Sequence, residues 1–343
     1  MPAVMNIMNT KQRIKDLSTF LLLNSCALPS SGLAQGKAGV ALALFEAAHL
    51  LKDDYLEDKA FGLIEEALLT KTEDISMSSG TSGIGLVLKH LIGRRLLEAD
   101  FSDLFEDRLQ HISQRTEELM GRKMYKLPDM MGLYVFWRYM DTDRAVAERQ
   151  CCLDIVDRYL SNHFSDLEKG EKLPIDLTPT GALLASYLQM LCRCHGEGTS
   201  IPLLCRFEQL YASRRLCGSQ TLKFYWTYLS KTHPGVLIPK KLSMTDYGNT
   251  EDLDIMPLSE LQSIHYLRLK DTTTFVPERE RVIANYVACT DEELEQRLSR
   301  IAYLHSAGVG LGSGIAKLLL LLCYALNDDL DDDARDMFDP FLL

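Results

Sequence analysis

The first residues whose types could take part in binding or catalysis lie in a glycine-rich stretch that ends at a lysine, Gly32-Leu33-Ala34-Gln35-Gly36-Lys37. The order G-x-x-x-G-K is one residue shorter than a phosphate-binding loop, and Ala38 stands where such a loop carries a Ser or Thr. No strand pattern precedes the stretch, so we expect no nucleotide site. Lys37 instead opens an apolar helical run, where a cation opposes the helix dipole. We keep Lys37 as a candidate contact for a peptide carboxylate, beside the simpler interpretation of a solvated lysine.

Cysteine and histidine are the other candidate reactive residues. The chain has nine cysteines, and most of them lie inside apolar helical runs, where cysteine acts as a small buried hydrophobe. This usage is typical of a reduced compartment, so we expect a cytoplasmic protein. His49 and His90 come late in apolar helices, and we expect each to bond a nearby carbonyl.

The overall charge bears on the class of partner. The chain carries 48 acidic and 37 basic residues, a net charge of -11. This balance argues against nucleic acid or an anionic membrane as partner and favours a neutral or basic peptide. The longest uninterrupted apolar segment, Leu318 to Leu326, is too short to span a bilayer, so we expect no membrane insertion.

Two kinds of helix alternate along the chain. Nearly all-apolar stretches indicate helices buried on most sides, and stretches with one charged face indicate helices at the surface. After a first helix at 10–24, the apolar helices are predicted at 40–51, 84–97, 130–140, 181–194 and 309–326, and the amphipathic ones at 54–70, 101–120, 144–160 and 201–211.

The pattern breaks in two places. Residues 233–257 contain several prolines and form a predicted irregular insertion, in which Tyr247 is a candidate peptide contact. Residues 327–343 form an acidic tail, either solvated or a docking site for a basic partner. The run at 328–333 lacks the Gly and terminal Glu of a calcium loop.

Glycine-led helix starts recur at Gly36, Gly83, Gly132 and Gly181, with steps of 47, 49 and 49 residues. Such a period is typical of arrays of two-helix units. With apolar inner and amphipathic outer helices, this predicts an all-α fold, an α/α toroid of six or seven helical hairpins in a single domain spanning 1–343. The glycines would let the inner helices begin close together.

Three segments carry a family resemblance. Residues 20–25 (FLLLNS), 32–39 (GLAQGKAG) and 79–86 (SGTSGIGL) resemble the first units of the lanthionine synthetase C-like family. They are most similar to the short members found beside peptide-maturation genes in Bacteroidetes-type bacteria. The resemblance covers residues 15–95 and returns at 308–326. It implies an α/α toroid and a role with ribosomally made, modified peptides.

The family's zinc motifs are only partly present. Zinc-containing members resemble one another in a Trp-Cys-x-Gly turn and a Cys-His-Gly turn, whose ligands hold zinc and activate a peptide thiol. No cysteine follows Trp137 or Trp226, but Cys194-His195-Gly196 is present, at the end of a predicted apolar helix where the family's turn begins one. Cys192 and Cys205 are the nearest third ligands. We expect no cofactor; zinc on Cys194 and His195 is the alternative.

The sequence therefore predicts a lanthionine synthetase C-like protein that binds or scaffolds a precursor peptide with other peptide-maturation proteins, without catalytic zinc. The first alternative is a thioether-forming cyclase with a rearranged zinc site. The second is a carbohydrate-active α/α toroid, which needs paired carboxylates at helix starts. Only Asp129 and Asp176 lie near such starts.

Overall fold

A computed structural model describes residues 2–26, 28, 30–122, 125–140, 142–169, 178–212, 225–226, 229, 285–287, 290, 292–293, 309–312, 314–327 and 337–342. In this part of the chain the protein is all-helical and contains no strand, and Ser30 and Gly36 form one isolated bridge. The chain divides into two compact units, residues 1–123 with 260–342 (the first unit) and residues 124–259 (the second unit). The insertion predicted at 233–257, including Tyr247, lies outside the described residues.

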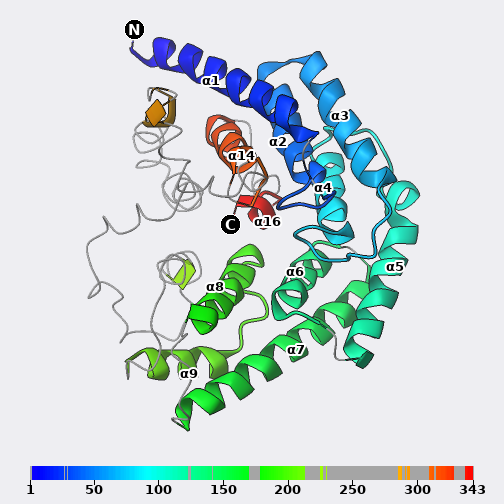
Figure 1. Ribbon diagram of the computed structural model, residues 1–343, viewed down its shortest axis with the longest axis vertical. Coiled ribbons are helices and arrows are strands. Elements are labelled where there is room, and N and C mark those ends of the chain that lie inside the picture. The colour runs from blue at the N-terminus through cyan, green and yellow to red at the C-terminus, as the bar shows by residue number, and fades with distance from the viewer. Residues whose placement is uncertain are drawn as a thin grey trace. The chain divides into compact units, whose positions relative to one another are not determined.

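The first unit is built around one buried helix, α2 (Lys37–Leu51), on which four other helices pack. Every residue from Ala38 to Ala48 is buried, as expected for a helix that is apolar all round. The helices around α2 are α1 (Pro2–Ser25), α3 (Asp54–Leu69), α4 (Thr81–Gly93) and α14 (Ile315–Leu326), and the unit also contains α5 (Phe101–Arg122), packed on α4, and the short α16 (Asp339–Leu342), packed on α14 (Figure 1).

The starts of α2, α4 and α14 meet through their backbones. The Ala34 amide donates to the Ser78 carbonyl at 2.7 Å, and the Gly312 amide donates to the Ala34 carbonyl at 2.8 Å. A Cβ atom on Gly83 would overlap the backbone of Met77 and Leu33. The glycine pattern predicts a close approach of the helix starts, and these three helices show it. The approach is possible because glycine has no side chain.

The second unit contains α6 (Leu127–Arg138), α7 (Asp143–Glu168), α8 (Thr178–Arg193) and α9 (Ile201–Ala212). The apolar α6 packs against α7 and α8, and α9 packs against α7. The Thr142 side chain caps α7 by accepting from the Ala145 amide at 3.2 Å. Apolar and amphipathic helices thus alternate here as the sequence predicts.

Four predicted boundaries were wrong by four or more residues. The first helix, predicted at 10–24, begins at Pro2, and the helix predicted to end at Leu160 ends at Glu168.

The other two errors lie at glycine- or arginine-containing turns. The helix predicted to reach Leu97 ends at Gly93, because Arg95 takes a left-handed conformation (φ 58°) and the next two amides donate back to Leu91. The helix predicted to begin at Val309 begins at Ile315. In both cases the prediction continues an apolar pattern through a turn: Leu96 and Leu97 follow α4 half-buried, and Val309 and Leu311 precede α14 buried.

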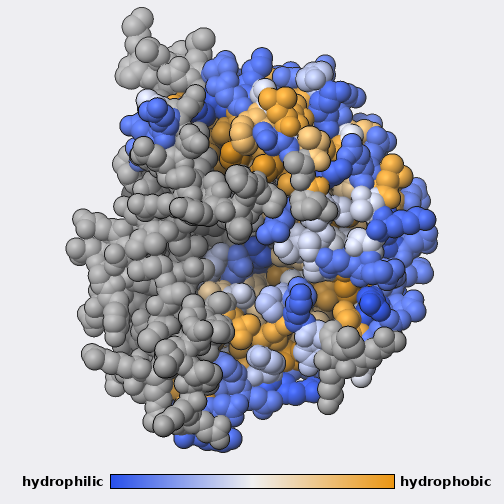
Figure 2. Space-filling model, in the orientation of Figure 1, coloured by the Kyte–Doolittle hydropathy of each residue, from blue (hydrophilic) through white to orange (hydrophobic). Residues whose placement is uncertain are grey.

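The described surface is mixed in character. Figure 2 shows hydrophobic and hydrophilic residues interspersed over the described part of one face. Exposed apolar side chains include Leu23 of α1 and Leu69 of α3. None of the helices searched in the described residues is long and apolar enough to cross a membrane.

Candidate carbonyl-binding site

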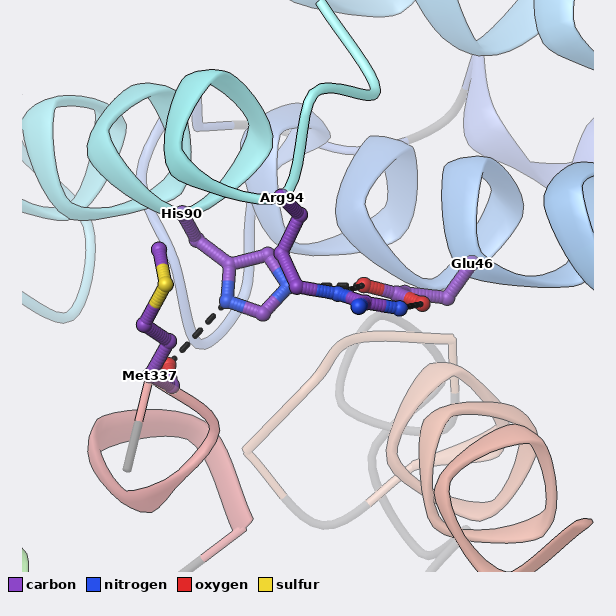
Figure 3. A network of polar contacts seen from close by, with 4 residues as sticks. All are labelled: Glu46, His90, Arg94 and Met337. Carbon is purple, nitrogen blue, oxygen red and sulfur yellow. Dashed lines mark hydrogen bonds and ion pairs between the residues drawn. The ribbon is translucent and has the colours of Figure 1, made fainter. Parts of the chain in front are cut away.

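A cluster of charged side chains lies in the core of the first unit. Glu46 projects from α2, and His90 and Arg94 come from the end of α4 (Figure 3). Glu46 Oε1 lies 2.7 Å from His90 Nε2, and Glu46 Oε2 lies 3.3 Å from an Arg94 guanidinium nitrogen. The side chains of Glu46, His90 and Arg94 are 2%, 1% and 11% exposed. Charges this deeply buried are rare unless they are paired.

Glu46 is ionised in this cluster. Burial by itself raises the pKa of a carboxyl group, but the hydrogen bond and charge of His90, together with the charge of Arg94, outweigh burial here. The pKa of Glu46 is consequently held below its ordinary value. Glu46 therefore acts only as an acceptor.

Hydrogen-bond geometry places an acceptor opposite each ring nitrogen of His90. Its Nε2 faces the Glu46 carboxylate, and its Nδ1 lies 3.1 Å from the main-chain carbonyl oxygen of Met337 (Figure 3). Both partners are acceptors, and a neutral imidazole has only one N–H to donate. Opposite an ionised Glu46, His90 donates to both acceptors when both of its ring nitrogens carry a proton.

A second buried side chain, Lys317, contacts the same C-terminal part of the chain as His90 does, near Met337. Lys317 of α14 is only 3% exposed, and its ammonium group donates to the main-chain carbonyl of Phe341. His90 and Lys317 thus hold two carbonyls of residues 337–342, which we call the docked segment. We call Glu46, His90, Arg94 and Lys317 the carbonyl-binding site.

Aromatic contacts complete the attachment. The His90 ring meets Phe338 edge-on at 4.7 Å and Phe341 at 5.2 Å between ring centroids. The Arg94 guanidinium lies 5.7 Å from the centre of the Phe338 ring, and Tyr324 of α14 lies 5.1 Å from that ring. Phe338 and Phe341 are both fully buried. The site therefore combines main-chain recognition with two aromatic contacts.

The predicted zinc candidates lie in the second unit, in the turn that ends α8. His195 and Gly196 take left-handed conformations (φ 55° and 78°), and the Gly196 amide donates to the Leu191 carbonyl at 2.8 Å. This is the helix stop that the glycines predict. Cys194 is fully buried, and burial raises the pKa of its thiol. Among the described residues no group of three or more His, Cys, Asp or Glu side chains is arranged to hold a metal.

The other predicted residues are not part of the carbonyl-binding site as defined above. Lys37 is the first residue of α2, and its ammonium lies 2.6 Å from the carboxylate of Glu66 on α3. The carboxylate that we expected from a peptide is thus supplied within the first unit. Asp129 lies in the first turn of α6, and Asp176 lies outside the described residues.

Sequence reasoning missed most of the site. It found His90 and expected it to bond a carbonyl, and it does bond that of Met337, but it did not find Glu46, Arg94 or Lys317. The available signal was the presence of single charges in apolar runs, namely Glu46 within residues 40–51 and Lys317 within residues 315–326. A charge on a helix that is apolar on all other sides must find a partner in the core.

Comparisons with protein-family models, curated proteins and solved structures found no match to this chain.

Proposed function

We propose that this protein binds a segment of a ribosomally made peptide and presents it to, or scaffolds, other peptide-maturation proteins, without catalytic zinc. We further propose that its helices form an α/α toroid like that of the lanthionine synthetase C-like family, which the sequence resembles at residues 20–25, 32–39 and 79–86. The all-helical architecture and the backbone contacts between the starts of α2, α4 and α14 support this proposal.

One observation carries the functional part of the proposal. Basic side chains from two helices, His90 and Lys317, bind main-chain carbonyls of a segment far away in the sequence, and that segment also buries two phenylalanines. Main-chain recognition with pockets for selected side chains is a common way of binding peptides. The first unit therefore has the chemical groups that peptide binding needs.

Zinc-dependent cyclisation is less favoured by the local geometry. A cysteine binds zinc as a thiolate, and burial raises the pKa of the Cys194 thiol, which disfavours that form. The neighbouring carboxylate, Glu197, is paired with Arg138 at 2.8 Å and lies 3.6 Å from Arg149. Near-stoichiometric zinc in the purified full chain, lost in Cys194→Ala, would contradict our proposal and support the cyclase.

Selection from a random dodecapeptide display library tests peptide binding. We expect the purified full chain to enrich related peptides, whose binding is then measured by fluorescence anisotropy. Lys317→Gln should lower the affinity for these peptides, whereas Lys59→Gln, on the exposed face of α3, should leave it unchanged. Failure to enrich any peptide, on the wild-type chain and on a variant with the docked segment weakened, would overturn the proposed function.

A further inference from the structure

We propose that residues 337–342 are an internal ligand that occupies the carbonyl-binding site, and that the external ligand is an acidic peptide with two phenylalanines three residues apart. This inference rests on the proposed function and names the ligand class and the regulation of its site. The docked segment is the template, because its Phe338 and Phe341 have this spacing, and in the sequence Asp336 comes two residues before Phe338 and Asp339 directly after it.

The conformation of the docked segment depends on the site. Its helix, α16, has four residues, with the Phe341 amide donating to the Phe338 carbonyl at 2.9 Å. Helices shorter than about 12 residues are marginal in water even for favourable sequences. One turn of helix with two buried phenylalanines is therefore held in place by what it contacts, as a bound peptide would be.

Charge complementarity indicates an acidic ligand. The carbonyl-binding site contains three basic side chains, His90, Arg94 and Lys317, and one carboxylate, Glu46. These charges face two main-chain carbonyls, that of Met337, which precedes α16, and that of Phe341 within α16, and carbonyl oxygens carry partial negative charge. The chain before and within the docked segment is rich in aspartate, at positions 331–333, 336 and 339. A ligand that replaces the segment should match this charge.

The buried charges also favour exchange of the docked segment for another peptide over an empty site. If the segment leaves, His90 and Lys317 each lose a carbonyl acceptor inside a largely apolar core, and the loss of an acceptor for a buried charge is costly. A second peptide with carbonyls and phenylalanines at the same spacing restores these interactions. The segment should therefore exchange with a similar peptide and exclude peptides of other patterns.

A synthetic, fluorescein-labelled peptide with the sequence of residues 334–343 (ARDMFDPFLL) provides the direct test. It is titrated by anisotropy into the full wild-type chain and the full chain carrying Phe338→Ala with Phe341→Ala. We expect the double variant to bind at least about tenfold more tightly, because apparent affinity scales with the fraction of empty sites. Phe61→Ala, which removes a partly exposed phenylalanine of α3, is the matched control and should bind as wild type does.

Further variants define what the peptide contacts. A peptide with both phenylalanines replaced by alanine should lose binding, and so should the double variant with Lys317→Gln added. If the alanine double variant does not fold, Phe338→Leu with Phe341→Leu replaces it, since leucine keeps apolar side chains at both positions. Circular dichroism checks the helix content of each chain.

The outcomes separate the inference from the proposed function. If library peptides bind the wild-type chain and the double variant equally, or bind without paired phenylalanines, the function stands and the inference falls. If no peptide binds either chain, both fall. If the wild-type chain dimerises in sedimentation and the double variant does not, the occupant is the segment of a second copy, and the external-peptide inference is overturned.

Discussion

At the scale of single residues, Glu46 holds the charged cluster together. Glu46→Gln would leave His90 and Arg94 without their counter-charge in the core, and breaking a buried pair in this way costs about 3–5 kcal/mol. We expect a matching loss in the free energy of unfolding, measured by urea denaturation.

The matched control is Glu66→Gln, which removes a carboxylate that is 58% exposed and paired with Lys37. Such surface pairs contribute about 0–1 kcal/mol. If both variants lost equally little stability, the cluster around Glu46 would not be the buried ionic centre described above.

Glu46 also makes stability sensitive to acid. Its pKa is lower in the folded protein than its ordinary value of 4.5, so the unfolded chain takes up the proton first as the pH falls. The stabilisation is full above that value and is lost as the pH falls through the folded pKa. We expect the unfolding free energy of the wild type to drop as the pH falls below about 5, and that of Glu46→Gln to drop less.

Asp157 affects the pH dependence of stability in the opposite direction to Glu46. Burial raises its pKa to about 6, a hydrogen bond from Ser200 opposes this, and the charge of Asp154 adds to it. Its Oδ1 is buried without a hydrogen-bond partner in the described structure. Ionisation of Asp157 above that pKa therefore costs stability, which Asp157→Asn should recover.

We expect Asp157→Asn to raise the unfolding free energy at pH 7 by about 1 kcal/mol, a figure reduced because the side chain is only half-buried. The difference should vanish below about pH 4, where the carboxyl group is neutral in both states. Urea denaturation at the two pH values measures it. A gain that was equal at both would point to a cause other than charge.

At the scale of elements, the contacts between helix starts depend on glycine. Gly83→Ala would place a Cβ against the Met77 carbonyl and the Leu33 amide, and we expect it to cost at least about 2–3 kcal/mol because backbone must move. Gly62→Ala, in the middle of α3 with no atom within 4 Å of the added Cβ, should instead stabilise by about 0.5–1 kcal/mol. Thermal unfolding compares the two, and a similar effect of both would contradict the close approach.

At the scale of the whole molecule, the chain divides into two compact units, and the carbonyl-binding site belongs to the first. Weakening the docked segment with Phe338→Ala and Phe341→Ala should therefore loosen its neighbours α4 and α14. We expect faster amide hydrogen exchange there and unchanged exchange in α6 to α9, measured by mass spectrometry. Equal acceleration in both units would mean that they unfold as one.

The positions of many helices could be predicted from the sequence. Apolar runs such as 40–51 and amphipathic runs such as 54–70 predict α2 and α3 within three residues at each end, because burial on all sides or on one side leaves a distinct periodicity. The turn at Cys194-His195-Gly196 was likewise readable, since glycine tolerates the left-handed backbone that ends a helix.

The carbonyl-binding site was decided only by tertiary structure. Local periodicity identifies Glu46 and Lys317 as charges on apolar helices, but it does not indicate which distant groups neutralise them. Their partners come from positions 44 and 24 residues away, on other helices. Only the packing of α2, α4, α14 and the docked segment brings these groups within hydrogen-bonding distance, because the cost of burying a charge is met by whatever the fold places beside it.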